Sequence, residues 1–158
     1  MTTPADSYRN VQACVQEVME GLDQQCALLE TLRQLASSQG PLIEASEHDS
    51  LLEVVRKRQE LVDRLDTTRT GMSTAIHQLQ EDLDDMPQDV RVGLRARIAK
   101  VQKLVDQVAE IDAKDANQLK QHQATCRERL ERLTATTTAR QGYRTATKPD
   151  ARFADAKG

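Results

Sequence analysis

The side chains best suited to chemistry, three histidines and three cysteines, are scattered along the sequence. His77 and Glu81 are four residues apart, a spacing that places both on one side of a helix and suits either two metal ligands or a surface ion pair. Di-metal helical bundles use Glu-x-x-His pairs, and this sequence contains none. We therefore interpret His77–Glu81 as a surface ion pair. His48 and His122 fall in other predicted elements, so we expect no metal site.

Catalysis requires polar groups that converge in a pocket. The sequence has no glycine-rich phosphate loop and no nucleophile elbow. Three aromatic residues and six glycines leave little material for an active site. We expect neither an enzyme nor a bound cofactor. Cys14, Cys26 and Cys126 stand at or beside helical apolar positions without a Cys-x-x-Cys pair, which predicts reduced core thiols.

Composition limits the classes of partner. The net charge of −3 makes nucleic acid a poor general partner. No stretch of 18 apolar residues predicts a membrane span, and residues 1–9 do not resemble a secretory signal. With reduced cysteines, these features favour a cytoplasmic protein.

The central helix is predicted from a run of alternating steps of four and three residues. Eight of its ten positions are apolar, a heptad pattern that keeps one side of a helix against a partner: Leu51, Val55, Arg58, Val62, Leu65, Arg69, Met72, Ile76, Leu79 and Leu83. Arg58 and Arg69 interrupt the pattern. Either their stems lie on apolar surface with the charge in water, which we prefer, or they offer charge to a partner.

Two further helices flank this one, so the fold class is all-α: an elongated antiparallel bundle of three long amphipathic helices with a disordered C-terminal tail. The predicted helices are about 8–36, 50–84 and 88–136. Residues 37–41 are expected to end the first helix, because Gly40 can adopt a left-handed cap and Pro41 interrupts the ladder. Gly21, inside that helix, should cost about 1 kcal/mol relative to alanine.

The third helix contains a polar interval at residues 112–118. This interval faces water, bends the helix or shifts its register. We prefer an exposed end or a register shift, because unpaired buried carboxylates are costly. The domain boundaries that follow are a disordered start at 1–7, a helical bundle at 8–138 and a basic flexible tail at 139–158.

The order of these features resembles the FlgN-like family of flagellar export chaperones. The similarity lies in a leucine-rich first helix, the segment 42–52 (LIEASEHDSLL), the Lys/Gln-rich heptads after Arg56, the polar interval with Asn117, and a basic Gly–Tyr element at 140–143. It covers about residues 10–145. The break at 37–41 departs from the family, whose first helix often continues further.

The resemblance implies a cytoplasmic, substrate-specific chaperone of flagellar type III export. Such proteins bind the helical C-terminal segments of hook-associated (hook–filament junction) proteins, prevent premature assembly and deliver these clients to the export gate. We expect helix-in-groove binding on an apolar stripe of the third helix: Leu119, His122, Cys126, Leu130 and Leu133. We expect export-gate docking by Arg140, Tyr143 and Arg144, or else Tyr143 is an ordinary tail residue.

Two other classes of function fit the sequence. A structural or adaptor coiled-coil protein would satisfy its heptads by self-association, whereas a chaperone would be a monomer or weak homodimer with an unsatisfied stripe. A peripheral membrane adaptor would need bulky apolar residues in the basic tail, which contains only Tyr143 and Phe153.

Overall fold

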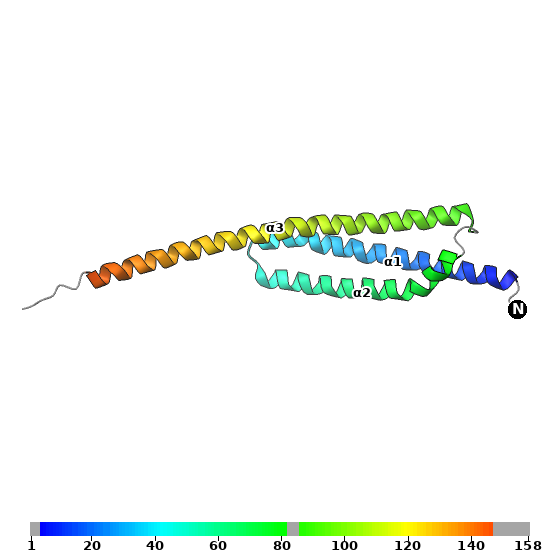
Figure 1. Cartoon of the computed structure of the whole chain (residues 1–158), viewed down its shortest axis with the longest axis horizontal. Helices are drawn as coiled ribbons and strands as arrows, with labels where there is room; N and C mark the ends of the chain where they lie inside the picture. Colours follow the sequence, from blue (N-terminus) through cyan, green and yellow to red (C-terminus); the bar gives the residue numbers. More distant parts are fainter. Residues whose placement is uncertain (1–3, 82–85, 147–158) are drawn as a thin grey trace, which may run out of the picture. The chain divides into compact units, whose positions relative to one another are not determined.

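Three long helices make up the described part of the chain (Figure 1). The computed structural model describes residues 4–81 and 86–146, and side chains at 10–80 and 86–143. The helices are α1 (Pro4–Glu44), α2 (His48–Glu81) and α3 (Gln88–Ala146). No strand occurs among the described residues. The predicted fold class is confirmed, while residues 147–158, where most of the predicted tail falls, lie outside the described part.

The chain divides into two units at residue 118. The first unit, residues 1–118, contains α1, α2 and the first half of α3, side by side with alternating directions (Figure 1). The second unit, residues 119–158, contains the rest of α3. The helical assignment of α3 has no break at residues 112–118, so the sequence's polar interval does not interrupt the helix.

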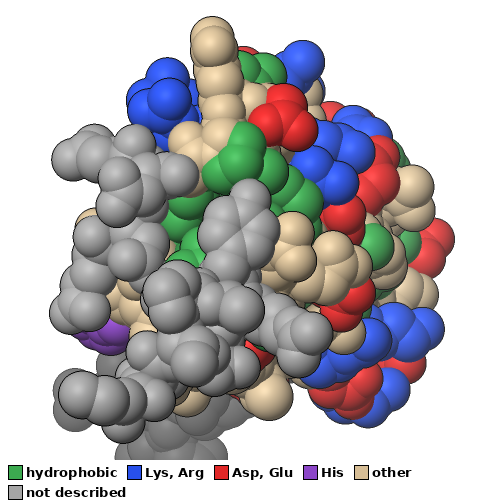
Figure 2. Space-filling view, turned by 90° about the vertical axis from the view of Figure 1, so that its right-hand side faces the viewer, with side chains coloured by type: hydrophobic (Ala, Val, Ile, Leu, Met, Phe, Trp, Pro, Cys, Tyr) green, Lys and Arg blue, Asp and Glu red, His purple; other side chains and the backbone are tan. Residues whose placement is uncertain are grey.

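Two apolar clusters hold the first unit together. One joins Cys14, Val18 and Leu22 of α1 to Ala75 and Leu79 of α2, with Met86 and Leu94 from the third segment. The other joins leucines of α1 to α2 and α3: Cys26, Leu28, Leu29, Leu32, Leu61, Leu104 and Val108. At the end of the unit near the α2–α3 connection, apolar side chains lie beside charged ones (Figure 2). Every cluster contains residues from all three helical segments, so no helix pair is sufficient for the core.

Helix α1 is longer than predicted, because it continues through Pro41 to Glu44. Continuation buries Ile43, which is 4% exposed, and this gain offsets the ladder hydrogen bond that Pro41 cannot donate. The helix ends at Glu44, and Ser46, two residues later, supplies the left-handed cap with a φ of 57°. The amide of Glu47 donates to the Leu42 carbonyl (3.0 Å) and that of Ser46 to Ile43 (3.1 Å), the pair of bonds of a Schellman motif.

The prediction that Gly40 caps the helix is therefore wrong, and its role is close approach. A Cβ at Gly40 would lie 3.3 Å from Asp115 Oδ1 and 3.4 Å from Gln118 Oε1 of α3. No described glycine has a positive φ. Glycine allows α1 and α3 to approach each other at this point.

Two other predictions about packing need correction. In the N-terminal half of α2 the buried position is Leu61, whereas Val55 and Val62 are 47% and 44% exposed. Buried and half-buried positions of this half include Val54, Arg58, Leu61 and Leu65. They keep the heptad spacing but take the steps of four and three in the other order, so Val54 and Leu61 replace Val55 and Val62 in the contact stripe. Cys14 and Cys26 are buried as expected, but Cys126 is exposed.

Gly21 is a site of tight helix packing. A methyl group there would overlap Sδ of Met72 and lie 2.5 Å from its Cγ, and Met72 is 4% exposed. We expect Gly21→Ala to lower the free energy of unfolding by about 1–3 kcal/mol through overpacking, despite alanine's better helix propensity. Urea denaturation followed by circular dichroism measures this change.

Gly71 supplies the matched control, because nothing lies within 4 Å of a Cβ placed there. Gly71→Ala should stabilise the protein by about 0.5–1 kcal/mol. Equal stabilisation by both substitutions would show that Met72 does not depend on a glycine at position 21.

Candidate functional site

The stripe predicted on the third helix lies in the second unit and is largely exposed. Leu119, Leu130 and Leu133 are 47%, 65% and 64% exposed, Cys126 is exposed, and His122 is half-buried. Their spacing in one unbroken helix puts all five on the same side. The structure therefore places these residues together, although it contains no partner that would test their role.

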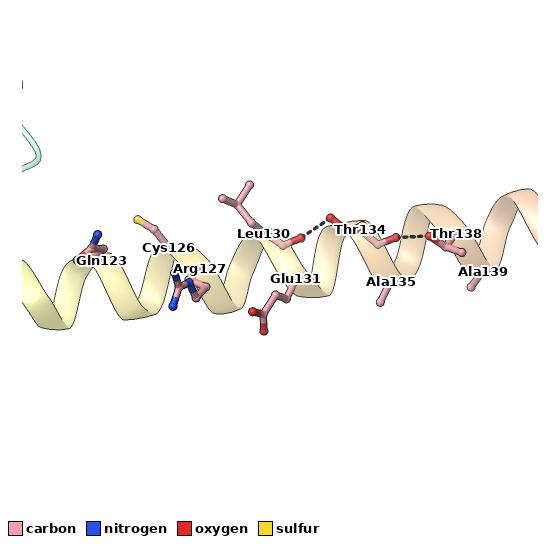
Figure 3. Close-up of a pocket in the computed structure, with 9 residues that line it drawn as sticks. All are labelled: Gln123, Cys126, Arg127, Leu130, Glu131, Thr134, Ala135, Thr138 and Ala139. Atoms are coloured by element: carbon pink, nitrogen blue, oxygen red, sulfur yellow. Dashed lines mark hydrogen bonds between the residues drawn. The ribbon is translucent and has the colours of Figure 1, made fainter.

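A shallow groove follows an adjoining side of the same helix (Figure 3). Cys126 and Leu130 belong both to the stripe and to the groove, and Figure 3 shows them pointing to the same side. The remaining lining residues were not singled out by the sequence analysis: Gln123, Arg127, Glu131, Thr134, Ala135, Thr138 and Ala139. Only Thr138 and Ala139 lie beyond residue 136, where the helix was predicted to end. The other five lie within the predicted helix but beside its apolar positions, so the apolar spacing did not indicate them.

The threonines at the end of the stripe present little polarity to a partner. The hydroxyls of Thr134, Thr137 and Thr138 donate to the backbone carbonyls four residues earlier, at 2.9 Å each. Thr138 bonds to the Thr134 carbonyl, as Figure 3 shows. Because a donated hydroxyl turns toward its own helix, the methyl groups remain available for contact. These methyl groups therefore extend the apolar side of the helix.

The residues predicted to dock at the export gate occupy the last turns of α3. Arg140, Tyr143 and Arg144 all precede the end of that helix at Ala146. Tyr143 is 77% exposed. Their assignment to a flexible tail from residue 139 is therefore wrong, because α3 continues eight residues past residue 138. Their role in docking remains a prediction.

The first unit contains a buried polar junction where α1, α2 and α3 meet. Arg58 donates one hydrogen bond to Gln39 Oε1 and another, of 2.8 Å, to Asp112 Oδ2. The Arg58 side chain is 17% exposed and that of Asp112 is 43% exposed. Arg58 differs from both interpretations made from sequence, because its charge pairs with Asp112 of α3 in the same chain, at a junction that is only partly buried. Arg69 is 74% exposed and pairs with Asp66 on its own helix.

Asp115 extends this junction and is the buried exception in the polar interval, whose residues 113, 114, 116 and 117 are exposed, in line with the preference for an exposed interval. It is 6% exposed, and its Oδ2 has no hydrogen-bond partner. Gln118 donates its amide to Glu44 Oε1 at 2.9 Å, which turns Gln118 Oε1 inward, also without a partner. Two buried acceptors without a donor are costly. Burial of these two acceptors therefore destabilises the fold, and it was not expected from the sequence.

Neutral Asp115 should stabilise the fold. Burial raises the pKa of Asp115 above its ordinary value, the Asp112 carboxylate raises it further, and Arg58 lowers it. The folded chain therefore holds this proton to higher pH than the unfolded chain, and the stabilisation is lost as pH rises through the folded pKa. We expect Asp115→Asn to raise the free energy of unfolding at neutral pH by about 1 kcal/mol, with the gain shrinking toward pH ~4.

Asp112→Asn is the contrasting control for this measurement. It removes the charge that pairs with Arg58, so stability at neutral pH should fall where Asp115→Asn raises it. Chemical denaturation at a series of pH values distinguishes the two. A loss of stability in Asp115→Asn at neutral pH would contradict the assignment of Asp115 as a destabilising charge.

The described histidine, cysteine and acidic side chains do not form a metal site. Among the described residues, no group of three or more His, Cys, Asp or Glu is placed to hold a metal ion. His48 begins α2 and His77 is exposed on it. The side chain of Glu81 and the acidic residues 82–85 lie outside the described part, so the predicted His77–Glu81 pair is not visible. Within the helices described, none is long and apolar enough to cross a membrane.

The fold and the exposed stripe define an all-α protein with an uncovered helical surface, a class suited to binding another chain. The FlgN protein family model matches residues 14–150, nearly the whole sequence. The chain therefore belongs to the FlgN family, a family of flagellar export chaperones. Comparisons with curated proteins and with solved structures found no match.

Proposed function

We propose that this protein is a cytoplasmic, substrate-specific chaperone that binds the helical C-terminal segments of hook-associated proteins. It keeps these clients from assembling early and delivers them to the export gate of the flagellar type III system. Membership of the FlgN family supports the class of client. The observation that carries the proposal is the exposed leucine stripe of α3, since exposed contiguous apolar surface marks an interaction site.

The proposed binding mode is helix addition. A client segment lays its apolar side along Leu119, Cys126, Leu130 and Leu133, with His122 at the margin. Affinity then comes from apolar burial, and release needs only competition for the client at the gate. No cofactor is required for either step.

The decisive experiment combines client capture with oligomeric state. The intact chain is mixed with purified hook-associated proteins, and complexes are measured by size-exclusion chromatography with light scattering. A stoichiometric complex with a client, and a monomer or weak dimer without one, supports the chaperone. A stable homodimer or larger assembly that captures no client would favour a self-associating structural coiled coil.

Truncation tests whether client binding and export-gate docking use different parts of α3. A chain ending at residue 138 retains the leucine stripe and removes Arg140, Tyr143 and Arg144. We expect its dissociation constant for clients to rise by no more than about fivefold, the effect of losing one exposed cation, and delivery to the export gate to be lost. A motility assay and a secretion assay measure delivery. Loss of client binding in this truncation would place part of the client site in the final turns.

The substitution Tyr143→Ala refines this test, because it leaves the chain length unchanged. Normal export with Tyr143→Ala, but not with the truncation, would identify the tyrosine as an ordinary residue. A secretion defect with intact client binding would support gate docking.

A further inference from the structure

The charge of this protein is divided unequally between its two units. Residues 1–118 carry 13 Lys and Arg against 21 Asp and Glu, a net charge of −8. Residues 119–158 carry nine against four, a net charge of +5. These values sum to the −3 of the whole chain. The overall acidic composition therefore conceals a basic unit that bears the exposed leucines.

Within the second unit the cations lie beside the leucine stripe. At 3.6 residues per turn, Lys120 and Arg127 flank it on one side, and Arg129 and Arg140 flank it on the other. All four residues are exposed. The carboxylates Glu128 and Glu131 lie further round the helix. The nearest charges to either edge of the stripe are thus positive.

The carboxylates of this unit do little to neutralise that margin. Glu128 lies 3.9 Å from Arg132, on the side of the helix away from the leucines. Glu131 lines the groove one turn after Arg127, but no ion pair joins them. Among the side chains described at residues 119–140, no carboxylate forms an ion pair with the cationic margin, which consists of Lys120, Arg127, Arg129 and Arg140.

The positive charges on both sides of the leucine stripe favour some partner helices over others. A second copy that paired its own stripe here would bring two cationic margins together, and like charges across a helix interface oppose pairing. A partner helix with acidic residues beside its apolar stripe would instead place carboxylates against four cations. Opposite charges at such flanking positions set partner choice in helix pairs.

We propose that the leucine stripe of α3 takes an acidic amphipathic helix, one whose apolar stripe is bordered by Asp and Glu on both sides. This inference rests on the proposed chaperone function and names the chemistry of its client segment. Leu119, Leu130 and Leu133 supply the apolar contact, and Lys120, Arg127, Arg129 and Arg140 supply the electrostatic complement. The threonine methyl groups extend the apolar contact past Leu133.

Two synthetic peptides test the proposal on the full chain. Both carry the same leucine stripe, and the flanking positions are all glutamate in one and all lysine in the other. Fluorescence anisotropy should show the glutamate peptide binding at least about tenfold more tightly, with the difference shrinking as salt is raised. Equal affinities would overturn the proposal and leave a plain hydrophobic docking site.

Charge reversal provides matched variants. Arg127→Glu combined with Arg129→Glu should reduce binding of the glutamate peptide about tenfold or more, by converting two attractions to repulsions. Arg132→Glu together with Lys114→Glu makes the same change in net charge away from the stripe, and binding should change by less than about threefold. Equal losses in the two double variants would show that total charge, rather than the margin, attracts the peptide.

The test separates this inference from the proposed function. If hook-associated proteins bind the intact chain with no preference for the glutamate peptide, the chaperone function stands and the acidic-helix inference is wrong. If the glutamate peptide binds but no hook-associated protein does, the inference stands and the client assignment fails. Light scattering that rises with protein concentration, and is abolished by the arginine reversals, would assign the stripe to the acidic unit of a second copy.

Discussion

We expect the double replacement of Leu130 and Leu133 by aspartate to abolish client capture while the helices remain folded. Both side chains are about two-thirds exposed in the free chain, at 65% and 64%. Burying each under a client helix contributes roughly 1.5–3 kcal/mol, so losing both weakens binding by at least about a hundredfold. Titration calorimetry with a purified hook-associated protein measures the loss, and far-ultraviolet circular dichroism checks helicity.

Leu52→Asp is the matched control for this substitution. Leu52 is 67% exposed on α2, in the other unit. Leu52→Asp makes the same leucine-to-aspartate change as each substitution in α3, at nearly the same exposure. The dissociation constant for clients should remain within about twofold of that of the native chain. If Leu130→Asp/Leu133→Asp binds as tightly as the native chain, the client site lies elsewhere and the proposed stripe is wrong.

We expect Arg58→Ala to destabilise the first unit by about 2 kcal/mol. Its guanidinium joins Gln39 of α1 to Asp112 of α3, and its side chain is 17% exposed. In Arg58→Ala the Asp112 carboxylate loses its partner, and Asp115 loses the nearby cation that lowers its pKa. Removing one member of a buried pair costs about 3–5 kcal/mol, and the partial exposure of Asp112 reduces this.

Arg56→Ala is the control, because the two arginines stand in the same helix. Arg56 is 60% exposed. Among the described side chains, it forms ion pairs only with Glu53 and Glu60 of its own helix. Its loss should cost about 0.5 kcal/mol or less. Urea denaturation measures both variants. Equal effects of Arg56→Ala and Arg58→Ala would show that the polar junction contributes no more than a surface pair.

The sequence by itself determined the secondary structure and much of the core. The recurrence of Val18, Leu22, Met72 and Leu79 at helical spacing predicts burial, and all four are buried. This succeeds because helical periodicity is local: a few residues of sequence specify which side of the helix is apolar. The exposed stripe at residues 119–133 could likewise be predicted, because it exceeds what the other helices cover.

The tertiary structure decided where polar and small residues belong. Pairing of Arg58 with Asp112 depends on the relative register of α2 and α3, across 54 residues of sequence. Gly21 similarly faces Met72, which arrives from another helix. Neither contact produces a periodic pattern in the sequence. The sequence therefore predicted that Arg58 extends its charge into water and that Gly21 only weakens its helix.

The ends of helices also required the three-dimensional contacts. Pro41 and Gly40 are strong local signals for termination, but burial of Ile43 and the approach of α3 outweigh them. Glycine costs about 1 kcal/mol and proline about 3 kcal/mol in a helix interior, whereas burying one aliphatic side chain contributes roughly 1.5–3 kcal/mol, so burial of Ile43 and the packing of α3 together offset the two local signals. The sequence therefore determined which segments are helical, and packing between segments decided where each helix ends and which charges it buries.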